Sequence, residues 1–440
     1  MFPREKPFVL GSEPYQEDLV STLEQGNREK TVLILLASVQ FAHVMDFMVM
    51  MPLGPQLMRI FSLNTSEFGH IVSAYGISSG LAGLLSAPFI DRFDRRTFLK
   101  FCLVGLFAGT LLCGLAPSAP ILMIARCVAG FFGGILGALV QAVISDVFPP
   151  ERRGFAISRV MLAFSIASVF GVPLGLLMAN KLGWHAPFLI VSGLLLALYL
   201  AAQFRFPSLT GHIDPSVTVK SRISQMFHFF SEKNAILGFL ATIFIIMGQF
   251  MVIPFISPYL VNNLGFPENN LPLIYLFGGL SSIITMPFIG KFTDKLTPHK
   301  TFPVGIVVSI FPLFILTHLT TSNMFYILTV TSLFMICMGG RMVPFMSLLT
   351  TVVEPRKRGS YLSLTASIQS LAQGAAALSA SAIVSTGVNK ELIGYGTAGW
   401  LAALFSLITL YLGFQIAKAA ANSAQQKHSK MPSQPQPTLE

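Results

Sequence analysis

Long apolar runs, each bounded by short polar segments, follow one another from position 31 to position 418. A helix that crosses the hydrocarbon core of a bilayer needs about 20 apolar residues. The runs have this length and lack the alternation of a half-buried strand, so they indicate helices and argue against a β-barrel. The pattern predicts twelve spans, at residues 31–56, 68–90, 98–116, 120–147, 157–180, 186–206, 235–262, 270–290, 302–320, 323–351, 360–386 and 395–418.

The composition agrees with a membrane protein. Hydrophobic residues make up 53% of the 440 residues and charged residues 11%, whereas a soluble domain has about 25% charged residues. An ordinary soluble enzyme and a disordered chain are therefore excluded. The net charge of +10 does not indicate nucleic acid as a partner, because the basic residues lie in short connections between apolar runs. The predicted fold class is an all-α polytopic membrane protein.

The distribution of basic residues predicts the orientation. Seventeen Lys and Arg residues fall in the connections on one side and three on the other. The first side is expected to be cytoplasmic, with both termini there. We expect a cytoplasmic tail at 1–30, a linker at 207–234 with an amphipathic helix along the interface, and a disordered cytoplasmic tail at 419–440.

The two halves of the chain repeat each other. The letters DFMV at 46–49 correspond to QFMV at 249–252, and PFIDRF at 88–93 corresponds to PFIGKF at 287–292. Two repeats of the same polarity predict two pseudo-symmetric six-helix bundles, at 31–206 and 235–418. Their interface is the usual place for a transported solute.

At this point the chain resembles the major facilitator superfamily, and within it the twelve-helix drug:proton antiporter type. The loop signature of that family appears as APFIDRFDRR at 87–96, in which Ala87 and Asp94 replace the family's glycines. A second signature appears as Arg126 followed by Gly130, and the exporter motif appears as Gly171-Val172-Pro173, with one residue between glycine and proline. The resemblance implies the major facilitator fold and a role for Arg126 in proton transfer. It also implies a gating cluster at the cytoplasmic helix ends, for which the candidates are Asp91, Arg92, Arg95, Asp146 and Asp294. Asp146 is the expected partner of Arg92 or Arg95.

Asp46 is the most informative residue, because it is the one acid deep inside a predicted span. A carboxylate there must be neutralised, paired or in contact with a wet cavity, which points to proton coupling. A structural hydrogen bond from a protonated Asp46 is the alternative. His43 and Gln40 precede it at spacings of three, and this stripe is expected to face the cavity. His43 would share the proton or simply line the cavity.

Arg126 and Arg341 are the two basic residues deep inside predicted spans. Arg126 would serve proton transfer or a packing salt bridge. Arg341 has no basic repeat mate, and would bind an anionic group of the substrate or act as the counter-charge of Asp46. Further polar residues expected to contact substrate are Gln141, Gln249, Gln369 and Gln373.

Three functions compete. The leading one is a proton-coupled secondary transporter that works by alternating access and exports small amphipathic compounds as an antiporter. The second is a transporter of organic anions such as a carboxylate or siderophore, with Arg341 as anchor. The third is a non-transporting sensor or a membrane-embedded enzyme. Two features of the sequence argue against it: the chain has no nucleotide-binding loop and no His/Glu metal pair at helical spacing. We therefore expect no enzyme activity, cofactor or metal. We expect a small-molecule substrate, protons and the lipid bilayer as partners, a monomer, and location in a bacterial inner membrane.

Overall fold

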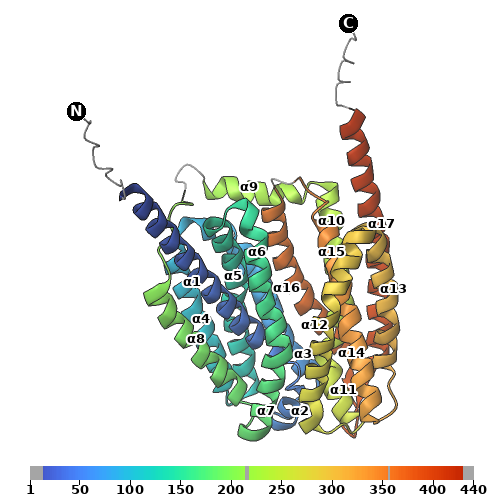
Figure 1. Ribbon diagram of the computed structural model, residues 1–440. Coiled ribbons are helices and arrows are strands. Elements are labelled where there is room, and N and C mark those ends of the chain that lie inside the picture. The colour runs from blue at the N-terminus through green and yellow to red at the C-terminus, as the bar shows by residue number, and fades with distance from the viewer. Residues whose placement is uncertain (1–12, 214–217, 355–356, 430–440) are drawn as a thin grey trace, which may run out of the picture.

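The structure is a computed structural model that describes residues 13–213, 218–354 and 357–429. Its helices form two bundles that stand side by side, with α9 running across one end of both (Figure 1). The end that carries α9, the start of α1 and the end of α17 is called the basic end, and the opposite end is called the far end. The all-helical membrane fold that the sequence predicts is confirmed.

The N-bundle contains the helices that precede the linker. They are α1 (Glu13–Val49), α2 (Gly54–Ile60), α3 (Thr65–Ser86), η1 (Ile90–Arg92), α4 (Arg95–Gly114), α5 (Ala119–Val147), α6 (Pro150–Ile166), η2 (Ala167–Gly171), α7 (Val172–Leu182) and α8 (Ala186–Arg205). The linker holds α9 (Val219–Phe229).

The C-bundle repeats this plan. Its elements are α10 (Lys233–Phe250), η3 (Ile253–Phe255), α11 (Ile256–Asn262), η4 (Glu268–Asn270), α12 (Leu271–Leu296), α13 (Pro298–Thr317), α14 (Met324–Gly340), α15 (Met342–Leu349), α16 (Arg358–Ile383) and α17 (Tyr395–Ser429). A two-residue hairpin ladder, β1 (Ser385–Thr386) with β2 (Leu392–Ile393), joins α16 to α17.

Eleven helices of the described part are long and apolar enough to cross a membrane, one fewer than predicted. The difference is α16, which forms at the predicted eleventh span with 26 residues but is rich in serine, glycine, alanine and glutamine. Small and polar residues suit α16 because it packs on α3 of the other bundle rather than on lipid.

Glycines allow the two bundles to touch along α3 and α16. A Cβ on Gly76 would lie 2.7 Å from the backbone nitrogen of Gly374, and one on Gly69 would lie 2.2 Å from Cβ of Ser381. On the other side of the interface, α12 packs against η2 and α7 but barely contacts α6. The bundles are therefore joined along one side, and on the other side mainly toward the far end.

Helix breaks occur at equivalent places in both bundles. α1 ends at Val49, before Pro52 and Pro55, and α10 ends at Phe250, before Pro254 and Pro258. Proline lacks the amide hydrogen that continues a helix. Paired interruptions of this kind mark the solute region in transporters built from repeats.

The fifth span carries a different break, the π-helical turn η2. Such a turn contains one residue more than an α-helical turn, and it ends at Gly171, the first residue of the Gly171-Val172-Pro173 motif. A Cβ on Gly171 would lie 2.0 Å from the sulfur of Met45, so glycine here allows α1 to approach closely.

The terminal helices differ from the predicted tails. α1 begins at Glu13, inside the tail predicted at 1–30, and α17 continues to Ser429, inside the tail predicted as disordered at 419–440. The parts of these predictions at 1–12 and 430–440 lie outside the described residues.

Candidate functional site

The carboxylate of Asp46 is enclosed within the N-bundle, three residues before the end of α1. The hydroxyl of Thr110, on α4, donates to its Oδ1 at 2.9 Å. Arg126, on α5, donates from Nη1 to the Asp46 carbonyl at 2.9 Å, and the same nitrogen lies 3.5 Å from Oδ2. Asp46 is 0% exposed and Arg126 is 1% exposed. Asp46 therefore faces α4 and α5 rather than a cavity. The Arg126 guanidinium balances its charge, so the carboxylate needs no contact with water.

Arg126 connects Asp46 to two aromatic side chains. Its guanidinium carbon lies 4.2 Å from the centre of the Tyr75 ring, a cation–π contact. The Tyr75 hydroxyl lies 3.1 Å from Nδ1 of His43, with the donor set by the histidine tautomer. His43 and Asp46 lie on the same helix, but the contacts that connect their side chains run through Tyr75 and Arg126. We call Asp46, Thr110, Arg126, Tyr75 and His43 the acid–arginine cluster.

The glycines of α5 leave room for the acid–arginine cluster. A Cβ on Gly130 would lie 2.5 Å from the Tyr75 carbonyl oxygen. One on Gly133 would lie 2.5 Å from the Tyr75 hydroxyl and 2.9 Å from the His43 ring. The sequence did not identify Tyr75 and Thr110, although small residues at a spacing of three on α5 signal that a large side chain packs against them.

The acid–arginine cluster touches the interface between the bundles through α1. His43, Phe47 and Gln40 are each partly exposed. The Phe47 ring packs on Tyr75 with centroids 5.4 Å apart and on Phe250 of α10 at 6.1 Å. A continuous series of side-chain contacts, Asp46 to Arg126 to Tyr75 to Phe47, therefore leads to Phe250 of the C-bundle.

Arg341 is enclosed within the C-bundle. It is 0% exposed at the junction of α14 and α15, and it donates to the hydroxyls of Ser309 and Ser406 and to the Ile245 carbonyl at 2.9–3.2 Å. It is not the counter-ion of Asp46, since Arg126 holds that place. Among the described residues it has no carboxylate partner, and its Nε has no hydrogen-bond partner.

The predicted glutamines are partly exposed, but they do not form one cluster with Asp46. Gln40 and Gln249 lie on α1 and α10, and Gln141 on α5. Gln369 and Gln373 lie one turn apart on α16, and Nε2 of Gln369 is buried without a hydrogen-bond partner among the described residues.

The predicted gating residues are split between a cluster and two isolated side chains. Arg95, 2% exposed, donates to Asp146 at 2.7 Å, to Asp91 at 2.8 Å and to the Ile90 carbonyl at 2.7 Å. Asp91 also pairs with Arg222 of α9. Of the two expected partners of Asp146, Arg95 pairs with it and Arg92 does not, and Nδ1 of His212 lies 3.5 Å from the same carboxylate. Arg92 and Asp294 are exposed and have no ion pair within the described ranges.

Asp94, which replaces a family glycine, binds the start of the linker through hydrogen bonds. Its carboxylate caps α4 by accepting from the Thr97 amide at 3.1 Å, and it accepts from the Leu209 amide at 2.7 Å and the Ser208 hydroxyl at 2.9 Å. Partial burial raises the pKa of Asp94, but these hydrogen bonds outweigh burial and lower it below its ordinary value of 3.8.

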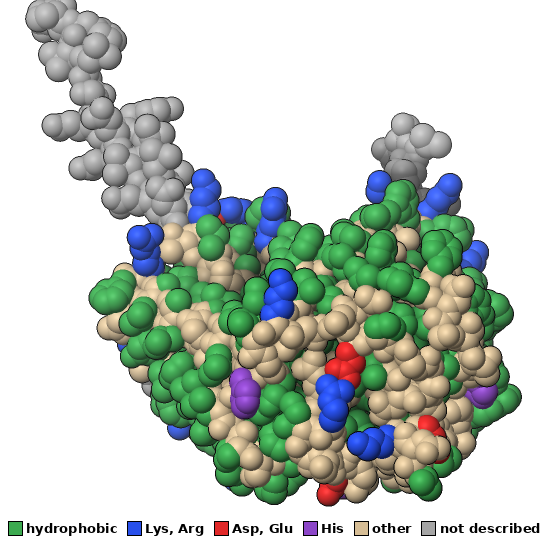
Figure 2. Space-filling model, turned by 90° about the horizontal axis from the view of Figure 1, so that it is seen from below, with side chains coloured by type: hydrophobic (Ala, Val, Ile, Leu, Met, Phe, Trp, Pro, Cys, Tyr) green, Lys and Arg blue, Asp and Glu red, His purple; other side chains and the backbone are tan. Residues whose placement is uncertain are grey.

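The far end is closed by contacts between the bundles. Arg59 of α2 forms a two-pronged ion pair with Glu268 of η4, and the rings of Phe68 and Phe255 meet edge to face at 6.1 Å. The Thr65 hydroxyl donates to the Val384 carbonyl at 2.6 Å. Seen from this end, most of the surface is hydrophobic or uncharged, and basic and acidic side chains adjoin near its middle (Figure 2).

Two helical bundles with paired helix breaks, a buried intramembrane acid–base cluster and one closed end define a polytopic membrane transporter of the two-bundle class. The sequence model of the Major Facilitator Superfamily matches residues 36–377 and 238–435. The chain belongs to the Major Facilitator Superfamily, and it is a membrane transporter rather than an enzyme.

Relatives and solved structures agree with this assignment. The uncharacterized MFS-type transporter YbcL of Bacillus subtilis (strain 168) is 24% identical over 381 residues, which cover 86% of this chain and 93% of that protein. A bacterial homolog of the human lysosomal transporter Spinster, inward-facing and unoccupied, matches with a TM-score of 0.69 at 17% identity, over 94% of this chain and 99% of that chain. A D-xylose-proton symporter matches with a TM-score of 0.70 at 17% identity, over 86% and 96%. These likenesses show the fold.

Proposed function

We propose that the protein is a proton-coupled antiporter that exports small amphipathic compounds, with Asp46 as the coupling group and the basic end in the cytoplasm. The observation that carries this proposal is the enclosed Asp46 carboxylate, bound by Arg126 and Thr110 inside the N-bundle. A fully buried acid is costly when charged and unpaired, so its protonation is tied to the position of its partner.

Protonation of Asp46 removes the negative charge that faces Arg126. The guanidinium then keeps its bond to the Asp46 carbonyl and its contact with Tyr75, and loses the attraction of Oδ2. Tyr75 touches both His43 and Phe47. The rings that border the C-bundle therefore experience the change, which is how proton binding would alter the contact between the bundles.

The conformation supports access from the basic end. The bundles meet at the far end through Arg59 and Glu268, whereas α6 and α12 barely touch along their basic halves. The gating cluster of Arg95, Asp91 and Asp146 lies wholly within the N-bundle and α9 here. We propose that alternating access closes the basic end by bringing the C-bundle, with Asp294, onto this cluster while the Arg59–Glu268 pair opens.

A flux experiment tests antiport against symport. Proteoliposomes loaded with a fluorescent amphipathic cation are given a proton gradient of either direction. Antiport predicts substrate movement opposite to the proton gradient, and the reversed gradient should reverse it. Movement in the same direction as protons would contradict the antiport assignment, and movement indifferent to the gradient would contradict proton coupling.

Organic-anion transport remains a second candidate because of one observation. Arg341 is a fully buried cation without a carboxylate partner among the described residues, so a substrate carboxylate could be its counter-charge in another conformation. Arg341→Lys should then weaken uptake of a carboxylate far more than that of a cation, because lysine lacks the guanidinium fork. Equal effects on both solutes would assign Arg341 to helix packing.

A further inference from the structure

A groove lies on the outer side of the N-bundle, away from the acid–arginine cluster. Its volume is about 1020 Å³, and it is bordered by the basic halves of α1 and α6 with Leu194 of α8. α8 packs on α1 and α4 at the edge of the molecule away from the C-bundle (Figure 1). The groove therefore faces the surrounding bilayer rather than the interface between the bundles.

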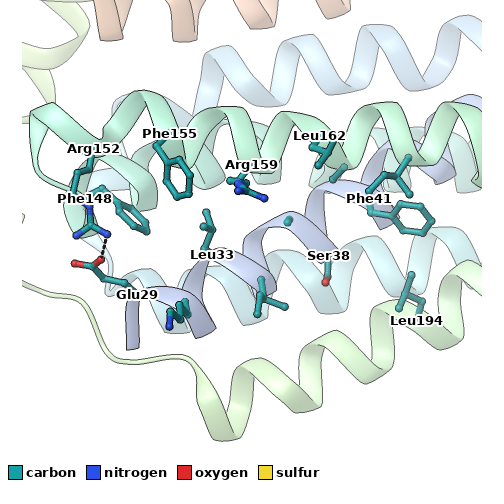
Figure 3. A pocket seen from close by; sticks show the side chains of 15 residues that line it. Glu29, Leu33, Ser38, Phe41, Phe148, Arg152, Phe155, Arg159, Leu162 and Leu194 are labelled. Atoms are coloured by element: carbon teal, nitrogen blue, oxygen red, sulfur yellow. Dashed lines mark ion pairs between the residues drawn. The ribbon is translucent and has the colours of Figure 1, made fainter. Parts of the chain in front are cut away.

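One end of the groove is basic. Lys30, Arg152 and Arg159 line it together with one acid, Glu29, which pairs with Arg152 at 2.9 Å. Figure 3 shows Arg152 and Arg159 of α6 and Glu29 of α1 beside the space between the two helices. Two positive charges, those of Lys30 and Arg159, have no acidic partner among the residues whose side chains the structure describes.

Arg159 is the unusual member of this set. It lies seven residues into the span beyond Arg152, about 10 Å deeper along the helix, and its side chain is exposed. Its guanidinium lies 5.1 Å from the Phe155 ring centre, with no carboxylate nearby among the described residues. A cation at this depth requires an anion or water, and it can reach toward the interface along its aliphatic stem.

The rest of the groove is apolar apart from Ser38. Phe155, Leu162 and Ile166 of α6 and Ile34 of α1 are between 41% and 68% exposed, and Phe41 and Leu194 continue the wall. From Glu29 to Phe41 the groove follows α1 for twelve residues, about 18 Å. A free phosphate or a small acid would leave this wall uncovered, whereas an acyl chain would cover it.

We propose that this groove is a binding site for one anionic phospholipid of the leaflet at the basic end. Its phosphate would lie among Lys30, Arg152 and Arg159, and an acyl chain would lie along the apolar wall. Basic pockets between membrane helices on the cytoplasmic side are suited to such head groups. The charge excess and the lipid-facing apolar wall together select an anionic lipid over a zwitterionic one.

The test is a binding titration of the purified full chain in a neutral detergent. Short-chain phosphatidylglycerol, matched phosphatidylcholine and inorganic phosphate are added at one ionic strength, and binding is followed by native mass spectrometry and thermal stabilisation. Phosphatidylglycerol should bind and stabilise the protein, and the other two should not. Equal binding of phosphatidylcholine, or full competition by inorganic phosphate, would overturn the proposal.

Variants locate the site. Arg159→Gln should weaken phosphatidylglycerol binding about fivefold, the effect of one cation near an anionic surface, and Lys30→Gln with Arg159→Gln about 25-fold. Arg159→Lys should retain most of the affinity. Lys291→Gln removes an exposed cation from α12 in the other bundle and should change nothing. Asp46→Asn should bind the lipid like the unmodified protein, so this experiment tests the lipid site independently of proton coupling. Unchanged affinity in the double variant would refute the site.

Discussion

The acid–arginine cluster owes its geometry to single small residues as much as to its charged ones. Asp46 and Arg126 come from α1 and α5. Gly130 lets the backbone of Tyr75 approach α5, and Gly133 leaves room for the Tyr75 hydroxyl and the His43 ring. Sequence reasoning identified Asp46, His43 and Arg126 because a charged or polar group inside an apolar run is conspicuous. It missed Tyr75 and Thr110, because tyrosine and threonine are common in spans and their roles depend on which helices become neighbours.

Gly133→Ala tests this geometry. The added methyl would lie 2.5 Å from the Tyr75 hydroxyl, so the ring must move and its contact with His43 should break. We expect a loss of about 1–3 kcal/mol in stability together with impaired transport. Gly137→Ala on the same helix is the matched control, because nothing lies within 4 Å of its Cβ, and it should be neutral or stabilising by up to about 1 kcal/mol. Melting curves measure the change in stability and flux assays measure transport. Equal behaviour of Gly133→Ala and Gly137→Ala in both would refute the packing argument.

At the scale of elements, the apolar pattern predicted the positions of the helices well and their ends poorly. α1 and α17 continue beyond the apolar runs as helices, because helix formation does not require a hydrophobic sequence. α16 is a helix at a predicted span that is less hydrophobic than the others. It packs on the other bundle through small residues, so it needs fewer apolar side chains. The direction in which Asp46 points could not be predicted, because the rotation of α1 depends on its contacts with α4 and α5.

The linker offers a pH-dependent element. Since the folded-state pKa of Asp94 is below its ordinary value of 3.8, its ionised form stabilises the docked linker above that pH. This stabilisation is lost as the pH falls through the lowered pKa. Asp94→Asn should therefore melt below the unmodified protein at pH 6, and the gap should shrink as the pH falls below about 3.8. Asp294→Asn, which removes an exposed acid, should melt close to the unmodified protein at pH 6. A gap for Asp94→Asn that does not change with pH would contradict the assignment.

At the scale of the whole molecule, the two ends of the bundle pair are in different states. Packed and polar contacts join the bundles at the far end, and the Arg59–Glu268 ion pair is the polar contact best placed to control opening there. The side chain of Arg59 is 58% exposed and that of Glu268 is 19% exposed, so the pair should contribute about 0.2–1 kcal/mol. This contribution is enough to shift a balance between two conformations up to about fivefold.

Removing the pair should open the far end. In a background without native cysteines, spin labels at Ile60 and Asn269 report the distance between α2 and η4. Arg59→Gln and Glu268→Gln should each increase the population of the longer distance. The double variant should do no more than either single change, because they remove the same interaction. Lys181→Gln, at an exposed cation near the same end, is the control, and additive effects of the two single changes would contradict a direct pair.

The account depends most on Asp46, and proton movement measured inside proteoliposomes tests it most directly. A pH-sensitive dye is enclosed, substrate is added, and the unmodified protein is compared with Asp46→Asn. The unmodified protein should move protons when substrate is added. Asp46→Asn should show none, while it still exchanges labelled for unlabelled substrate at equal concentrations, which proves that it is folded and able to alternate. Proton movement of normal size in Asp46→Asn would contradict the account.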